Sequence, residues 1–125
     1  MGWAVEYIEP QQFVRSVFTG KTTGKDLKEA TTHGLALGKK HQTNHYLVDI
    51  RQVEITASKV EILRLPKTQY TAEGLDMKSR IALLQPDSAK SRKAAHFYET
   101  ASLNRGWNVK IFKNQDDALA WLSSK

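Results

Sequence analysis

Strand-like and helix-like segments alternate along almost the whole chain, and this alternation restricts the fold more than any other feature. Two strand-like segments come first, and the remaining segments follow in the order α-β-α-β-α-β-α. The strand-like segments are residues 3–9, 12–20, 45–50, 80–86 and 107–113, and the helix-like segments are residues 25–40, 58–66, 89–106 and 114–125. Within these segments, Gly38 and Pro66 are expected to end the first two helices, and Asp49 the third strand. The pattern β-β-α-β-α-β-α-β-α predicts an α/β domain with a mixed, largely parallel five-stranded sheet and right-handed crossovers.

The two opening segments are joined by a short turn at Pro10, which predicts that they pair antiparallel. The central segments "YLV" (46–48) and "IALL" (81–84) are apolar at consecutive positions, as is typical of strands covered on both faces. If the helices cover only one face, a second subunit or another protein must cover the other. We therefore expect an unidentified protein partner or a homodimer.

Length and composition indicate one domain, residues 1–125, with 40% hydrophobic and 26% charged residues. The chain has no cysteine, which excludes disulfides and thiolate chemistry. No apolar run approaches the roughly 18 residues that a transmembrane helix needs, and the first ten residues lack the features of a signal peptide. We expect a cytoplasmic protein with no transmembrane segment.

The net charge of +6, from 19 basic and 13 acidic residues, raises the question of nucleic-acid binding. The basic residues are spread along the chain, and the densest groups, residues 39–41 and 90–93, are not interleaved with aromatic side chains. A solvated basic surface is the simpler interpretation, and nucleic acid is not an expected partner.

Residues 19–26, "TGKTTGKD", contain the glycines and lysines of a phosphate-binding loop but not their spacing. Gly20 and Gly24 enclose three residues instead of four, and Asp26 stands where a metal-binding hydroxyl is required. Thr23 and Asp26 instead match a capping box, in which each side chain hydrogen-bonds the backbone of the other residue. The stretch predicts the start of a helix.

No constellation of catalytic or metal-binding residues emerges from the sequence. His41 and His45 are four apart but lie between a helix expected to end at Gly38 and the next strand, so they share no helix face. No serine has the G-x-S-x-G setting of a nucleophile. We predict no catalytic residue, no metal and no cofactor.

The candidate binding residues lie in two places. Asp49 ends a central strand, where sites of α/β proteins gather, and Arg51 follows it closely. The long connection 67–78 contains Tyr70, Leu75 and Met77, which are candidates for the mouth of a pocket.

Three stretches carry a resemblance to a known family: "YLVDIRQVEITASKVEILRLP", "RIALL" and "ETASLNRGWNVKIFKNQDDALAWL". They resemble the SpoIIAA-like (STAS-like) proteins, many of them small bacterial chains. The resemblance covers nearly the whole chain and implies a superhelix of four β/α units.

The resemblance also implies a regulatory site. Relatives of the anti-sigma-factor-antagonist kind carry the motif D-S-S-G, in which a serine is phosphorylated, at the helix start after the central strand. This chain has "TASK" there, so Ser58, or less plausibly Thr56, would stand for the acceptor. Ser58 also begins a capping box with Glu61, which explains the serine without any modification.

Two functions of different classes follow. The favoured one is a non-catalytic protein-interaction or regulatory module. The alternative is a small apolar-ligand or lipid-binding domain, because the SpoIIAA-like architecture resembles that of Sec14-type lipid carriers and the basic surface suits anionic membranes.

Overall fold

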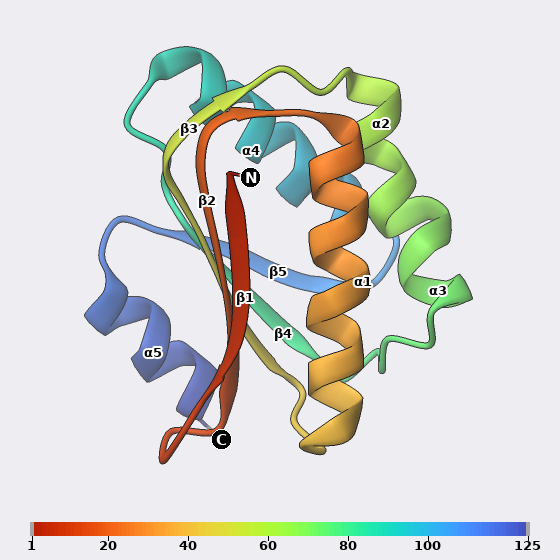
Figure 1. Cartoon of the computed structure of the whole chain (residues 1–125), viewed down its shortest axis with the longest axis vertical. Coiled ribbons are helices and arrows are strands. Elements are labelled where there is room, and N and C mark those ends of the chain that lie inside the picture. The colour runs from red at the N-terminus through yellow and green to blue at the C-terminus, as the bar shows by residue number, and fades with distance from the viewer. Residues whose placement is uncertain (1, 125) are drawn as a thin grey trace.

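The computed structural model describes residues 2–124 and contains a five-stranded mixed sheet with helices on both faces (Figure 1). The strands are β1 (Trp3–Ile8), β2 (Phe13–Thr22), β3 (His45–Ile55), β4 (Arg80–Leu84) and β5 (Asn108–Phe112). They lie in the order β1-β2-β3-β4-β5, with β1 antiparallel to β2 and all other neighbours parallel. The predicted fold class and the antiparallel opening pair are confirmed.

The helical elements divide unequally between the two faces of the sheet. They are α1 (Gly24–Lys40), α2 (Lys59–Arg64), the π-helical turn η1 (Leu65–Gln69), α3 (Tyr70–Ala72), α4 (Ala89–Leu103) and α5 (Gln115–Ser123). All of them except α5 pack on one face, here called the α1 face, and α5 alone packs on the other, the α5 face (Figure 1). Within residues 2–124, no helix is long and apolar enough to cross a membrane.

The helix starts follow from local sequence. Thr23 Oγ1 accepts a hydrogen bond from the amide of Asp26 at 3.1 Å, and the Asp26 carboxylate accepts one from the amide of Thr23 at 3.0 Å. Ser58 and Glu61 make the same reciprocal pair at the start of α2, with distances of 3.1 and 2.9 Å. Both capping boxes are confirmed, and "TGKTTGKD" is the end of β2 followed by a helix start.

The structure corrects the expectation that Pro66 stops the second helix. The helical segment continues through η1 and α3 to Ala72, here called the α2–α3 segment. Proline lacks an amide hydrogen and crowds the carbonyl four residues back, so it disturbs a regular α-helix. The wider π turn accommodates it, and the amide of Tyr70 donates to the carbonyl of Leu65, five residues earlier. Residues 67–72 are therefore helix and not part of a long loop.

Two other boundaries were also predicted wrongly. Strand β3 does not end at Asp49 but continues to Ile55, because its second half pairs with the end of β2. Helix α1 does not end at Gly38 but at Lys40. Gly38 is a buried residue within the helix. A glycine is needed there because the Tyr46 side chain occupies the space that a Cβ would need.

The α5 face does not depend on a second subunit for its cover. Helix α5 packs Ala118 and Leu122 onto an apolar cluster that includes Leu47 and Leu84. Alternation along the strands places Arg15 and Asp49 on this same face, and both are half-buried. A charged surface of this kind can remain in contact with water. The uncovered part of the sheet is therefore no argument for a dimer, and the dimer stays a prediction.

Candidate functional site

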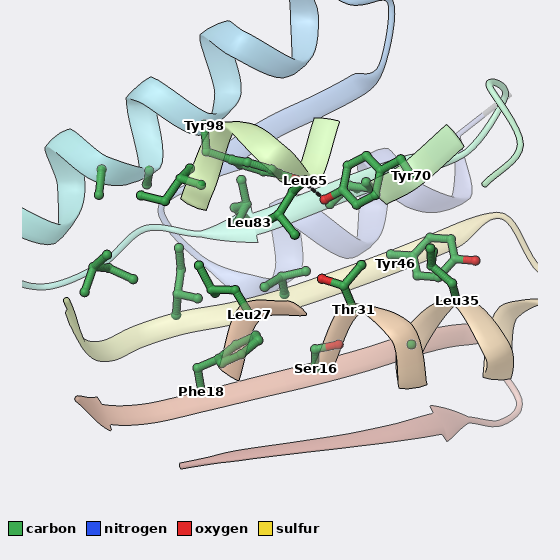
Figure 2. A pocket seen from close by; sticks show the side chains of 18 residues that line it. Ser16, Phe18, Leu27, Thr31, Leu35, Tyr46, Leu65, Tyr70, Leu83 and Tyr98 are labelled. Carbon is green, nitrogen blue, oxygen red and sulfur yellow. Dashed lines mark hydrogen bonds between the residues drawn. The ribbon is translucent and has the colours of Figure 1, made fainter. Parts of the chain in front are cut away.

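The α1 face contains a partly open apolar pocket with a volume of about 100 Å³. Strands β2, β3 and β4 form its floor, and α1, the α2–α3 segment and α4 form its walls (Figure 2). Most of the lining is aliphatic or aromatic, with Phe18, Leu27, Leu65 and Leu83 among the larger side chains. Protein cores are normally packed without voids larger than a water molecule, so a space of this size is a departure from ordinary packing.

Small residues on the surrounding elements leave this space open. Gly34 on α1 faces β2, and a Cβ there would lie 3.7 Å from Ser16 Oγ and 3.9 Å from Val14, which is ordinary contact. Ala94 and Ala95 line the pocket from α4. Each of these positions is occupied by a side chain too short to reach the middle of the gap between the helices and the sheet.

Two tyrosines form one wall. The hydroxyls of Tyr70 and Tyr98 hydrogen-bond each other inside the core (Figure 2). Burial raises the pKa of Tyr98 to about 12 and raises that of Tyr70 well above its ordinary value. Both phenols are therefore neutral at physiological pH.

The π turn positions Tyr70. Trp107 packs edge-on against its ring, with centroids 5.4 Å apart and an interplanar angle of 82°. The indole nitrogen of Trp107 also donates to the carbonyl of Pro66 at 2.8 Å. The proline that was expected to end the helix is thus the point at which the turn is anchored, and π turns are frequent at functional sites.

Two hydroxyls enter the pocket from the opposite side. Ser16 is on β2 and Thr31 is on α1, and Figure 2 shows both side chains in the space between that helix and the sheet. Neither hydroxyl has a hydrogen-bond partner among residues 2–124. Neither oxygen is among the completely buried side-chain atoms without a partner, which within residues 2–124 are Trp3 Nε1 and Ser102 Oγ, so both hydroxyls remain accessible from the pocket. Polar groups placed in an apolar lining can orient a ligand.

The lining contributed by the described residues contains no acidic, basic or histidine side chain. A buried charge without a partner is strongly unfavourable in such surroundings. The pocket is therefore suited to an uncharged molecule.

Exposed hydrogen bonds join α1 to the α2–α3 segment on the outside of the pocket. Gln69 Nε2 donates to the carbonyl of Lys28 at 3.0 Å and to the Glu73 carboxylate at 3.0 Å. Thr32 Oγ1 donates to the same carboxylate at 2.9 Å, and Lys39 Nζ donates to the carbonyl of Glu73. These exposed groups join two walls of the pocket without entering it.

Of the residues proposed for a pocket mouth, only Tyr70 lines this pocket. Leu75 is buried beside Tyr46 and Asp76 at a second, more polar hollow. Met77 is 52% exposed and lies next to Gly106, away from the pocket. The prediction placed these three side chains together because it treated residues 67–78 as one loop, whereas the helical part turns Tyr70 inward.

Asp49 and Arg51 pair with each other outside the pocket. Arg51 Nε and Nη2 donate to the two carboxylate oxygens at 3.0 and 2.8 Å. Burial pulls the pKa of Asp49 upward, but hydrogen bonds from Arg51 and the positive charges of Arg51 and Arg15 outweigh it, so the net pKa is lowered. On the α5 face, each of these two side chains therefore supplies the opposite charge and the hydrogen bonds that the other needs.

The two candidate phospho-acceptors differ in their surroundings. Ser58 is exposed at the start of α2, where its hydroxyl oxygen caps the helix. Thr56 is also exposed, but its hydroxyl donates to the carbonyl of Thr22 at 3.1 Å.

The histidines do not come together. The His41 ring stacks on Tyr7 with centroids 3.8 Å apart, and burial, with the nearby charge of Arg80, lowers the pKa of His45. Among residues 2–124, no three His, Asp or Glu side chains are grouped so as to hold a metal ion.

The sequence-based reasoning missed Ser16, Thr31 and Tyr98. A signal was present for the first two: Ser16 alternates with the inward-facing Val14 and Phe18, and Thr31 stands one helical turn after Leu27. Each is a polar residue on an otherwise apolar face.

Comparison with known proteins agrees with this fold. The SpoIIAA-like family model matches residues 13–123. A crystal structure of an uncharacterized protein of the DUF3478 family, with a SpoIIAA-like fold, from Shewanella loihica PV-4 superposes with a TM-score of 0.63 at 21% sequence identity, covering 97% of this chain and 93% of that one. No curated protein sequence matches. The chain belongs to the SpoIIAA-like family, as its sequence motifs predicted.

Proposed function

We propose that this protein is a non-catalytic binding domain that holds a small apolar molecule in the pocket of the α1 face. The single observation that carries the proposal is the apolar space of about 100 Å³ within the core. A known cavity of roughly 150 Å³ lined by aliphatic and aromatic side chains binds benzene, so a ring or a short hydrocarbon chain is the appropriate scale.

Filling the pocket makes binding favourable. An unfilled core cavity destabilises a protein by about 24 cal/mol per Å³, or about 2 kcal/mol for a space of about 100 Å³. A ligand that fills the space supplies the contacts that the lining side chains lack on that side.

The test is a thermal melt with small uncharged apolar compounds, comparing wild type with Ala94→Leu, which fills the pocket. Ala36→Leu makes the same change at an exposed position of α1 and is the matched control. A compound at tenfold excess over its Kd raises the melting temperature of wild type and of the control by about 3–6 °C but leaves Ala94→Leu unchanged. Equal shifts in all three proteins, or no shift in any, would refute the proposal.

The second candidate is the docking module that the family resemblance favours. Its support is the exposed start of α2, where Ser58 stands two residues before Val60. Val60 is 59% exposed, the highest relative exposure among the large hydrophobic residues described. A phosphate on Ser58 would add negative charge next to this apolar contact and weaken docking.

This candidate is tested by affinity capture with wild type, Ser58→Asp, Val60→Asp and Leu103→Asp. Leu103 is 52% exposed at the far end of α4 and serves as the control. A docking partner is retained by wild type and Leu103→Asp and lost from the other two variants. Identical captured proteins in all four samples would remove this candidate, and light scattering of the same samples measures whether a homodimer forms.

A further inference from the structure

The free hydroxyls of Ser16 and Thr31 say more about the ligand than the volume of the pocket does. Ser16 Oγ lies 3.7 Å from the Cβ position of Gly34, and Thr31 precedes that glycine by one helical turn. Residues three apart on a helix share a face. Both hydroxyls therefore belong to the same part of the gap between α1 and β2.

The rest of the lining cannot supply these hydroxyls with partners. The hydroxyls of Tyr70 and Tyr98 are already paired with each other, and the hydroxyl of Tyr46 lies against Gly38 at the second hollow. The remaining lining side chains of the described chain are hydrocarbon. A threonine in a helix can donate to the carbonyl four residues back, as Thr68 does to Arg64 at 3.0 Å, but Thr31 makes no such bond within residues 2–124. Each hydroxyl is therefore available to bond a polar atom that enters the pocket, and such a bond would orient a ligand whose body is apolar.

We infer that the pocket selects an uncharged ligand with an apolar body and one hydroxyl or carbonyl group, held by Ser16 and Thr31. This inference rests on the proposed function and narrows it to a ligand class. The apolar body fills the space against Leu65, Leu83 and the tyrosine pair, and the single polar group lies at the Ser16–Thr31 side (Figure 2). Carboxylates, phosphates and amines are excluded because the lining offers no opposite charge.

Three probes of nearly equal size separate these features: benzyl alcohol, toluene and benzoate, titrated at pH 7 and followed by the amide NMR signals of Gly34 and Ala95. Benzyl alcohol binds about 3- to 10-fold more tightly than toluene, because it adds one hydrogen bond without changing the apolar contact. Benzoate causes no shift at the pocket.

The variants Thr31→Val and Ser16→Ala remove each hydroxyl with little change of shape, and Thr100→Val, at an exposed position of α4, is the control. Each pocket variant weakens benzyl alcohol by about 3- to 10-fold and leaves toluene unchanged or slightly tighter. A circular-dichroism melt confirms that every variant is folded before titration.

The outcomes distinguish this inference from the proposed function. Equal affinity for benzyl alcohol and toluene, equal loss of both in Thr31→Val, or binding of benzoate would overturn the inference while leaving an apolar-ligand domain intact. Failure of all three probes to bind at the pocket would overturn both.

Discussion

The two faces of the sheet are built from the same strands but are packed differently. On the α5 face, one short helix closes tightly over the strands: Ala82, Leu84 and Ala118 are completely buried, and Leu122 is 2% exposed. On the α1 face, five helical elements surround a space that they do not fill. The contrast shows that helices packed on a sheet do not by themselves make a filled core. The sizes of the side chains at facing positions decide whether the space between helix and sheet is filled.

Neighbouring leucines of β4 offer the sharpest test of this contrast. Leu84 points under α5 and Leu83 points into the pocket. We expect Leu84→Ala to lower the free energy of unfolding by about 3–5 kcal/mol, and Leu83→Ala by about 2 kcal/mol, because a side chain that borders a void has fewer contacts to lose. Urea unfolding measures both. A greater loss in Leu83→Ala would show that the pocket is packed as tightly as the other face.

The reverse substitution, from alanine to leucine, should have a smaller effect on the free energy of unfolding. The size of this effect should differ between the two faces. Ala118→Leu forces extra methylenes into a filled core and lowers the free energy of unfolding by about 1–3 kcal/mol. Ala94→Leu enters the pocket and changes the free energy of unfolding by less than about 1 kcal/mol, in either direction. Thermal melts of the two variants make the measurement, and equal destabilisation would contradict a pocket on the α1 face.

The smallest expected effect concerns the charged part of the α5 face. The pKa of Asp49 is lowered in the folded state from its ordinary value of 3.8, so its ionised form stabilises the protein above that value and the stabilisation disappears as pH falls through the folded-state pKa. We expect Asp49→Asn to lower the free energy of unfolding by less than about 1 kcal/mol at pH 7, because Arg51 is exposed to solvent.

The difference between Asp49→Asn and wild type should shrink as the pH falls below 3.8 and through the lowered folded-state pKa of Asp49, because the wild-type carboxylate becomes protonated. Urea unfolding at a series of pH values checks this. A difference that persists undiminished at low pH would mean that the carboxylate acts through packing and not through its charge.

Local features of the structure were readable from the sequence because their causes lie within a few residues. The capping pairs Thr23–Asp26 and Ser58–Glu61 need only a spacing of three, and the apolar periods of strands and helices repeat along one segment. The family motifs extended this local information to the order of the strands.

The pocket was harder to predict because its walls come from distant segments. Tyr70 was noticed, but its partner Tyr98 is 28 residues away and its supporting Trp107 is 37 residues away. The prediction for Pro66 failed for a related reason. Proline disfavours a regular helix, but the bond from Trp107 to its carbonyl and the packing of Leu65 stabilise a π turn that allows the helix to continue.

The chain by itself determined the alternation of strands and helices, their capped starts and the apolar faces that bring them together, because these depend on nearest neighbours and on burial. The tertiary structure alone decided that short side chains from α1 and α4 meet opposite one another and leave a space, and that two hydroxyls remain unpaired beside it. The physical reason is that a void is the difference between the distance separating packed elements and the lengths of the side chains between them, and only the folded chain sets that distance.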